Sequence, residues 1–319
     1  MMLRIITFSL FLGASAGAAC AADPIYPLGS RLGFVPPPGF VASKNFPGFE
    51  NPDAKSMMMM AALPAQAYPD MEKAISAEAL KAQGVTEEKR ENLALPNNAK
   101  GVLVVGTDTD KERGKIRKWM LIEQLPEGVA LVSVVVPEPA FKTITDDMVR
   151  TSLKTLAVRA SIPMEEQLQL VPFKLNDMSG LHAVRVMGNN GVILTYGDKP
   201  TALPTDQPFF AVQIGPAPTD QNVDRDNFAR SLFTSPGDVK ELHVVSGELL
   251  KLGAGGSQLT HELQAEALDA FTNTPMKLVQ WVRFGNGSVI RMLGIARADQ
   301  WQTAFTHFRA VRDGIGPHE

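Results

Sequence analysis

The two residues with the clearest chemical potential are His261 and Glu248, which the sequence places on neighbouring strands. Residues 259–267 alternate between apolar and polar types, as a β-strand does, and His261 falls on the apolar side. If the glycine-rich stretch 253–256 is the centre of a hairpin, His261 lies directly opposite Glu248. The pair is then an acid–base couple, the polar anchor of a ligand pocket, or a structural polar pair at the margin of a sheet.

The neighbouring motifs do not add a cofactor or a metal to this pair. Residues 253–257 are rich in glycine but lack the GxGxxG spacing and the lysine of phosphate-binding loops. His261 and Glu262 begin like the H-E-x-x-H zinc motif, but Ala265 stands where the second histidine would be. We therefore expect no cofactor, no metal site and no assignable catalytic residue.

The first 21 residues have the composition of an export signal. Arg4 supplies a positive charge, residues 5–12 form a short apolar run, and small residues lead to an A-x-A cleavage site at 19–21. Cleavage there removes Cys20, the only cysteine, so we expect a periplasmic or secreted protein without disulfides or thiolate-bound metals. The alternative is a lipoprotein anchored through Cys20, because residues 17–20 resemble a bacterial lipobox.

Composition excludes several classes of partner. The chain has 319 residues and a formal net charge of −3, so it lacks the basic field that nucleic-acid binding needs, and we expect no nucleic-acid partner. Hydrophobic residues make up 45 % of the chain, which is enough for a packed core. Beyond the apolar run of the signal, no stretch of 18 apolar residues occurs, so we expect no integral membrane span after cleavage.

The elements that position His261 and Glu248 follow a pattern that occurs twice. In the first half, apolar runs predict strands at 56–63, 101–106, 116–122 and 129–136. Helical spacing predicts a helix at 68–83, and a capping residue predicts another after Thr145. The second half repeats this order with strands at 182–187, 192–196, 209–214, 242–252, 258–268, 276–284 and 288–295 and helices at 224–233 and 299–312.

The closing part of each half matches the other in kind. Each contains a strand with a tryptophan (Trp119, Trp281), a turn with glycine, an apolar strand, a helix and an Ala-Val-Arg triplet at 157–159 or 310–312. We interpret this as a duplication, the alternative being two unrelated α+β halves.

We therefore predict two tandem domains of the α+β class, each an antiparallel sheet covered by helices. The expected segments are a signal peptide at 1–21, a first domain at 22–160, a linker at 161–171 and a second domain at 172–319.

The order of elements resembles the PsbP-type fold of the extrinsic photosystem II subunit and its bacterial relatives. The resemblance rests on a leading short hairpin with PPPGF at 36–40, a helix, and an antiparallel meander closed by a helix, with FGNG at 284–287 before the last strand. It extends over nearly all of the mature chain. The resemblance implies sheets covered by helices, no catalytic residues to carry over, and a role as a binding or assembly subunit.

We therefore expect an exported, non-catalytic binding or assembly protein of the cell envelope, whose partner is an envelope protein or a small molecule. A cofactor-free hydrolase is one alternative, and it would use His261 and Glu248 with a hydroxyl that the sequence does not identify. A small-molecule carrier is the other, with a ligand in an apolar cavity between sheet and helices. A pocket that contains both residues beside a Ser or Thr would favour the enzyme, and a shallow polar surface would favour the binding protein.

Overall fold

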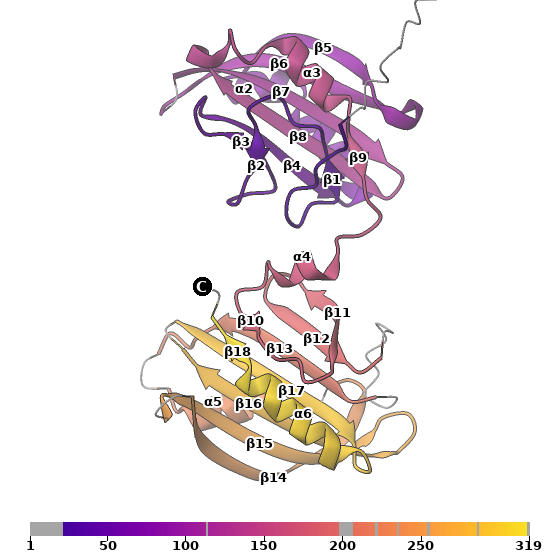
Figure 1. Cartoon of the computed structure of the whole chain (residues 1–319), viewed down its shortest axis with the longest axis vertical. Helices are drawn as coiled ribbons and strands as arrows, with labels where there is room; N and C mark the ends of the chain where they lie inside the picture. The colour runs from indigo at the N-terminus through magenta and orange to yellow at the C-terminus, as the bar shows by residue number, and fades with distance from the viewer. Residues whose placement is uncertain are drawn as a thin grey trace, which may run out of the picture. The chain divides into compact units, whose positions relative to one another are not determined.

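The structure is a computed structural model that describes residues 22–112, 114–197, 207–220, 223–234, 236–253, 256–285 and 287–317. Backbone contacts divide the chain into two compact units, the first ending at Ala160 and the second beginning at Ser161. Each unit consists of a sheet with helices packed on it (Figure 1). The expected signal peptide, including Cys20, lies outside the described residues.

Unit 1 is built on a seven-stranded antiparallel sheet with the strand order β2-β3-β4-β8-β7-β6-β5. The predicted strand at 56–63 is confirmed at both ends. The strands are β2 (Val41–Ala42), β3 (Gly48–Asn51), β4 (Ser56–Leu63), β5 (Thr86–Ala94), β6 (Lys100–Asp110), β7 (Gly114–Leu125) and β8 (Gly128–Pro137). A separate two-stranded pair joins β1 (Leu32–Gly33) to β9 (Ala157–Val158). The helices are α1 (Tyr68–Ala74), α2 (Ala77–Ala82) and α3 (Asp146–Leu153). The 3-10 turns are η1 (Ala65–Ala67), η2 (Pro96–Asn98) and η3 (Glu138–Ala140).

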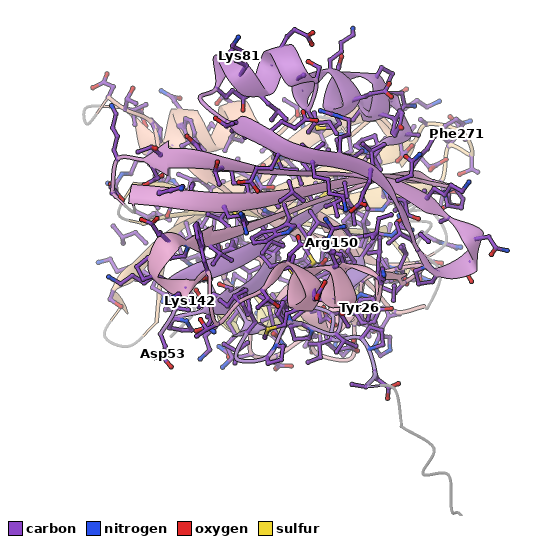
Figure 2. All side chains as sticks on the ribbon, turned by 90° about the horizontal axis from the view of Figure 1, so that it is seen from above. Tyr26, Asp53, Lys81, Lys142, Arg150 and Phe271 are labelled. Carbon is purple, nitrogen blue, oxygen red and sulfur yellow. The ribbon has the colours of Figure 1, made fainter. Side chains whose placement is uncertain are left out.

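The central strands of unit 1 are buried on both faces, because helices cover both sides of the sheet. The helices α1 and α2 cover one face and α3 covers the other, and Figure 2 shows Lys81 of α2 and Arg150 of α3 on opposite sides of the sheet. On the α3 side, Trp119 of β7 lies in the larger core, and its indole Nε1 donates a hydrogen bond to Asp146 Oδ1 at 2.7 Å. This bond ties the middle of the sheet to the first turn of α3.

Unit 1 differs from the sequence expectation at the leading hairpin, at one helix and at one edge strand. The expected hairpin around 36–40 does not form, because β1 pairs with β9 and β2 pairs with β3. The predicted helix at 68–83 is two helices, because the hydroxyl of Ser76 accepts a hydrogen bond from the backbone N–H of Ala79 and so starts α2 anew. The edge strand β5 was not predicted, because its sequence TEEKRENLA is charged and has no apolar alternation.

Unit 2 has the same architecture. Its seven-stranded antiparallel sheet has the order β11-β12-β13-β17-β16-β15-β14, in which each strand takes the place of its counterpart in unit 1. The strands are β11 (His182–Met187), β12 (Gly191–Thr195), β13 (Phe209–Pro216), β14 (Val239–Leu252), β15 (Gln258–Asp269), β16 (Pro275–Phe284) and β17 (Ser288–Arg297). The pair β10 (Lys174–Leu175) and β18 (Ile315–Gly316) is separate, and the helices are α4 (Met164–Leu168), α5 (Arg225–Leu232) and α6 (Trp301–Asp313).

The helices of unit 2 also cover both faces of its sheet. α6 packs on the larger core around Trp281, and α5 packs on the other face, where Ala229 contacts Val282. The close approach of α6 depends on Gly294 of β17, because a Cβ at this position would lie 2.5 Å from the ring of Phe308. The two units therefore share their strand order and the placement of their helices, as the repeat predicts.

The expected linker at 161–171 contains ordered structure that packs in unit 2. The helix α4 lies within it, Leu168 packs against the larger core of this unit, and Val171 is buried there. In the described part of the chain, no helix is long and apolar enough to cross a membrane.

We predict that residues 22–160 and residues 161–319 fold when they are produced separately, because each has its own core. A shorter second piece, 172–319, should unfold at a lower urea concentration, since it lacks the buried Val171, whose loss costs about 1–3 kcal/mol. Circular dichroism during urea unfolding checks both. An unfolded 161–319 piece would contradict the division into two self-sufficient units.

Candidate functional site

The two predicted site residues lie on the hairpin of β14 and β15, but they do not face each other. Glu248 pairs with Glu262, and His261 pairs with Leu249, so the predicted register is wrong by one residue. Gly253 and Gly256 both have positive φ, +74° and +71°, and the turn they flank is one residue longer than we expected. Because side chains alternate along a strand, a slip of one residue moves a partner to the other face. Ala254 and Gly255 of this turn lie outside the described residues.

His261 is buried on the face of the sheet that α5 covers. It is 8 % exposed, and its ring meets the ring of Phe284 edge-on at 5.8 Å. Its Nδ1 lies 3.6 Å from Oδ1 of Asp226 on α5. A hydrogen bond from Arg230 lowers the pKa of Asp226, with a smaller contribution from His261. The carboxylate partner of His261 therefore comes from α5 and not from β14, and the contact joins this helix to the sheet.

A buried carboxylate of this hairpin, that of Glu262, lies on the opposite face. It is 4 % exposed, and its Oε2 accepts a hydrogen bond from Trp281 Nε1 at 2.6 Å and lies 3.6 Å from Nη1 of Arg312. Its Oε1 accepts a hydrogen bond from Gln264 Nε2 at 2.7 Å. Sequence reasoning missed this group because the alternation indicated a solvent-facing side. Its hydrogen bond with Trp281 joins β15 to β16, and its ion pair with Arg312 joins these strands to α6, so its role is structural.

A hydroxyl–imidazole contact does occur in unit 2, but at another histidine. Ser179 Oγ lies 2.9 Å from His307 Nδ1, and Tyr196 packs edge-on against the same imidazole. The contact ties the loop before β11 to α6. This contact involves His307 and not His261, the histidine that the hydrolase alternative would use. In the described residues, no group of three or more His, Cys, Asp or Glu side chains could hold a metal ion.

The exposed feature of this hairpin is β14 itself, which forms an edge of the sheet. β-Bulges interrupt its first half, but residues 246–252 pair with β15 in regular register. Val245 and Leu249 are 52 % and 51 % exposed, and Glu248 is exposed as well. An edge strand presents backbone N–H and C=O groups on its outer side that can pair with another strand. The regular stretch 246–252 is therefore a template for strand addition.

The corresponding edge of unit 1 is protected. Residues 87–91 of β5 are all charged, and they form local ion pairs such as Arg90 with Glu87 at 2.8 Å and Lys89 with Glu91 at 2.9 Å. A row of charges prevents another strand from docking. The two units therefore differ at this edge of their sheets.

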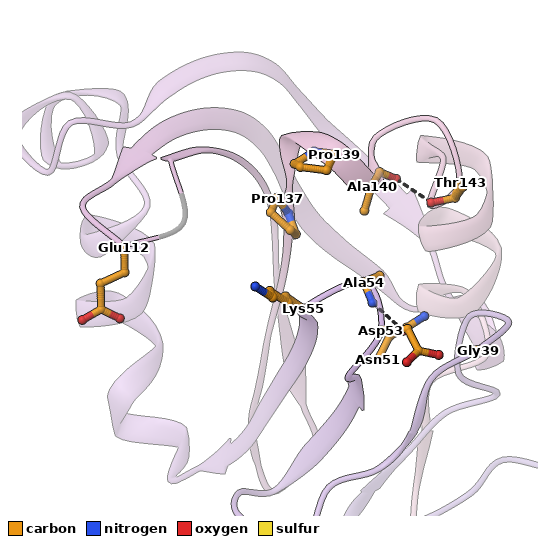
Figure 3. Close-up of a pocket in the computed structure, with 10 residues that line it drawn as sticks. All are labelled: Gly39, Asn51, Asp53, Ala54, Lys55, Glu112, Pro137, Pro139, Ala140 and Thr143. Atoms are coloured by element: carbon orange, nitrogen blue, oxygen red, sulfur yellow. Dashed lines mark hydrogen bonds between the residues drawn. The ribbon is translucent and has the colours of Figure 1, made fainter.

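Figure 3 shows a cavity of about 610 Å³ in unit 1, between the turns that follow β3 and β8. Two of its polar side chains close their own turns: Asn51 Oδ1 accepts from the backbone N–H of Ala54, and Thr143 Oγ1 donates to Ala140 O. Asp53, Lys55 and Glu112 also line it. These side chains belong to turns around the cavity. Neither of the predicted site residues, His261 and Glu248, lines it.

Comparisons with known proteins return structures of low similarity. No family model matches the sequence, and no curated protein matches it. The chain is similar to PsbP (CyanoP) of Synechocystis sp. PCC 6803, with 17 % identity and a TM-score of 0.28, over 44 % of this chain and 95 % of that one. It is also similar to LpqN of Mycobacterium tuberculosis, which is involved in cell envelope biogenesis, with 13 % identity and a TM-score of 0.32, over 46 % of this chain and 83 % of LpqN.

A third structure is similar over both units. The immunity protein TplEi of Pseudomonas aeruginosa aligns over 92 % of this chain and 96 % of its own length, with 11 % identity and a TM-score of 0.28. A PsbP structure is thus among the structures to which this chain is similar.

We predict that His261 and Glu248 act independently of each other. His261→Ala should lower the free energy of unfolding by about 1–3 kcal/mol because it removes buried packing, and Glu248→Ala should change it by less than about 0.5 kcal/mol. In a double-mutant cycle measured by urea unfolding, the two changes should add within about 0.5 kcal/mol. The matched cycle of His261→Ala with Asp226→Ala should show coupling of up to about 1 kcal/mol. Coupling confined to the Glu248 cycle would contradict the observed register.

Proposed function

We propose that this protein is an exported, non-catalytic binding or assembly protein of the cell envelope, and that it holds an extended segment of a partner protein along β14. The observation that carries the proposal is the regular, exposed edge at residues 246–252. Export rests on the composition of residues 1–21.

Strand addition suits this edge for a physical reason. Each backbone hydrogen bond to an added strand contributes about 0.5–1.5 kcal/mol, so several together hold an extended segment whatever its sequence. Side chains then select the partner. Leu249 lies on the α5 side of the strand, since it pairs with His261, and Glu248 lies on the α6 side, since it pairs with Glu262. The expected partner strand places an apolar residue beside Leu249 and a basic residue beside Glu248.

The proposed function gives a role to one of the two predicted site residues. Glu248 is an exposed specificity contact on the edge strand, whereas His261 supports the strand from inside through α5. A binding surface of this kind needs no nucleophile and no cofactor. It presents both an apolar and a charged side chain to a partner, those of Leu249 and Glu248.

The test is site-specific photocrosslinking in intact envelopes of the native host. A photoreactive amino acid at position 249 should give one adduct of discrete mass, because a partner strand lies against this residue. The matched control is position 271, since Phe271 is also an exposed apolar residue but lies on a loop (labelled in Figure 2). It should give no such adduct.

We predict that Leu249→Lys weakens the captured complex by about tenfold or more, because a lysine on an edge strand opposes pairing. The substitution should leave the free energy of unfolding unchanged within about 0.5 kcal/mol, since Leu249 is exposed. The check is the affinity for the purified partner that cross-linking identifies, with Phe271→Lys as the control. An equal loss in both variants, or equal adducts from positions 249 and 271, would argue against a docking role for β14.

A further inference from the structure

A second cavity of unit 1 is larger and lies where the chain leaves α3. Its volume is about 1070 Å³, and its lining comes from the end of β7, the β7–β8 turn, η2 and the chain around β9. Part of the wall is apolar and consists of Pro24, Pro96, Ala99, Leu125, Leu156 and Val158. A volume and a mixed lining of this kind suit an organic molecule.

The buried polar group of this cavity is Glu123. It lies on β7 in the row that begins with Trp119 and Leu121, on the face that α3 covers, and it is 7 % exposed. Its Oε2 is buried and has no hydrogen-bond partner in the described part of the chain. Burial raises the pKa of Glu123. A buried carboxylate oxygen without a donor is costly, so this position lacks its complement.

The arginines of the cavity are engaged elsewhere. Arg31 Nε donates to the backbone carbonyl of Arg159 at 3.2 Å, and its Nη2 lies 3.8 Å from Glu127 Oε2. Arg159 Nε donates to Ser30 O at 2.9 Å, and its guanidinium lies 4.9 Å from the ring centroid of Tyr26. These contacts join the segments around β1 and β9 and so fix one wall of the cavity. The unpartnered Oε2 of Glu123 therefore lines a cavity whose wall is already held in place.

We propose that this cavity binds an organic ammonium ion, whose N–H groups donate to Glu123 and whose hydrocarbon part packs against the apolar wall. An ammonium is the complement of a carboxylate, because it supplies both charge and several donors. An alcohol supplies one donor without charge, and a carboxylate ligand would be repelled. The site belongs to unit 1 and stands independently of strand addition at β14 in unit 2.

The test is calorimetric titration of the whole protein with primary alkylammonium ions from propyl to octyl, beside the matching alcohols and carboxylates. The best ammonium should bind at least about tenfold more tightly than its alcohol, and the carboxylates should not bind. Glu123→Gln keeps the shape of the side chain but removes its charge. It should weaken ammonium binding by about tenfold or more while alcohol binding changes little.

Glu112→Gln is the matched control, since Glu112 lines the smaller cavity of the same unit. It should bind alkylammonium ions as the wild type does. Three results would overturn the proposal: no saturable binding of any ammonium, equal binding of ammonium and alcohol by the wild type, or wild-type ammonium affinity in Glu123→Gln.

Thermal unfolding without ligand provides a second readout. The raised pKa of Glu123 means that the unfolded chain ionises it more readily, so this group lowers stability as pH rises from its unfolded pKa through its folded pKa. The other charged groups of the cavity are Arg31, Glu127 and Arg159. Glu123→Gln should therefore raise the melting temperature at about pH 8 and by less at about pH 4. A lower melting temperature at the higher pH would show that Glu123 already has a partner, and it would overturn the site.

Discussion

The constraint on which the rest of the structure depends is that each sheet is covered by helices on both faces. Residues on the central strands are therefore core residues, whatever their chemistry. The polar ones form internal contacts, as when the indole of Trp119 donates to Asp146 and that of Trp281 donates to Glu262. Burying such a carboxylate is tolerable only because donors surround it. Binding is left to the edges of the sheets and to places where the helices end.

The two units use this freedom differently although they share one topology. In unit 1 the edge strand β5 carries charges at 87–91, but the sheet face that continues beyond α3 leaves Glu123 buried without a donor. In unit 2 the buried carboxylate of Glu262, on β15, has hydrogen-bond donors, and the edge strand β14 is open instead. A fold that occurs twice in the chain thus offers a cavity in one unit and a strand edge in the other.

Much of the fold could be predicted from the sequence, because central strands and amphipathic helices have strong apolar patterns. The strands at 56–63 and 182–187 begin and end where the pattern predicts. The charged edge strand β5 has no such pattern and was missed. The contacts of the two candidate site residues were harder to predict, because the pairing of their strands depends on the length of one turn. A register shift of one residue separates His261 from Glu248, and no local pattern indicates that Asp226 of α5 would be the partner of His261.

In the proposed complex, residues 246–252 form an open edge that a partner strand covers. Amide hydrogen exchange measures this directly, because only amides whose N–H groups point outward depend on the partner for protection. We predict fast exchange at alternate residues of this stretch in the purified protein and slow exchange at the same residues when the protein is isolated within envelope complexes. Slow exchange at all of these residues in the purified monomer, or fast exchange that is unchanged in the complexes, would contradict the claim.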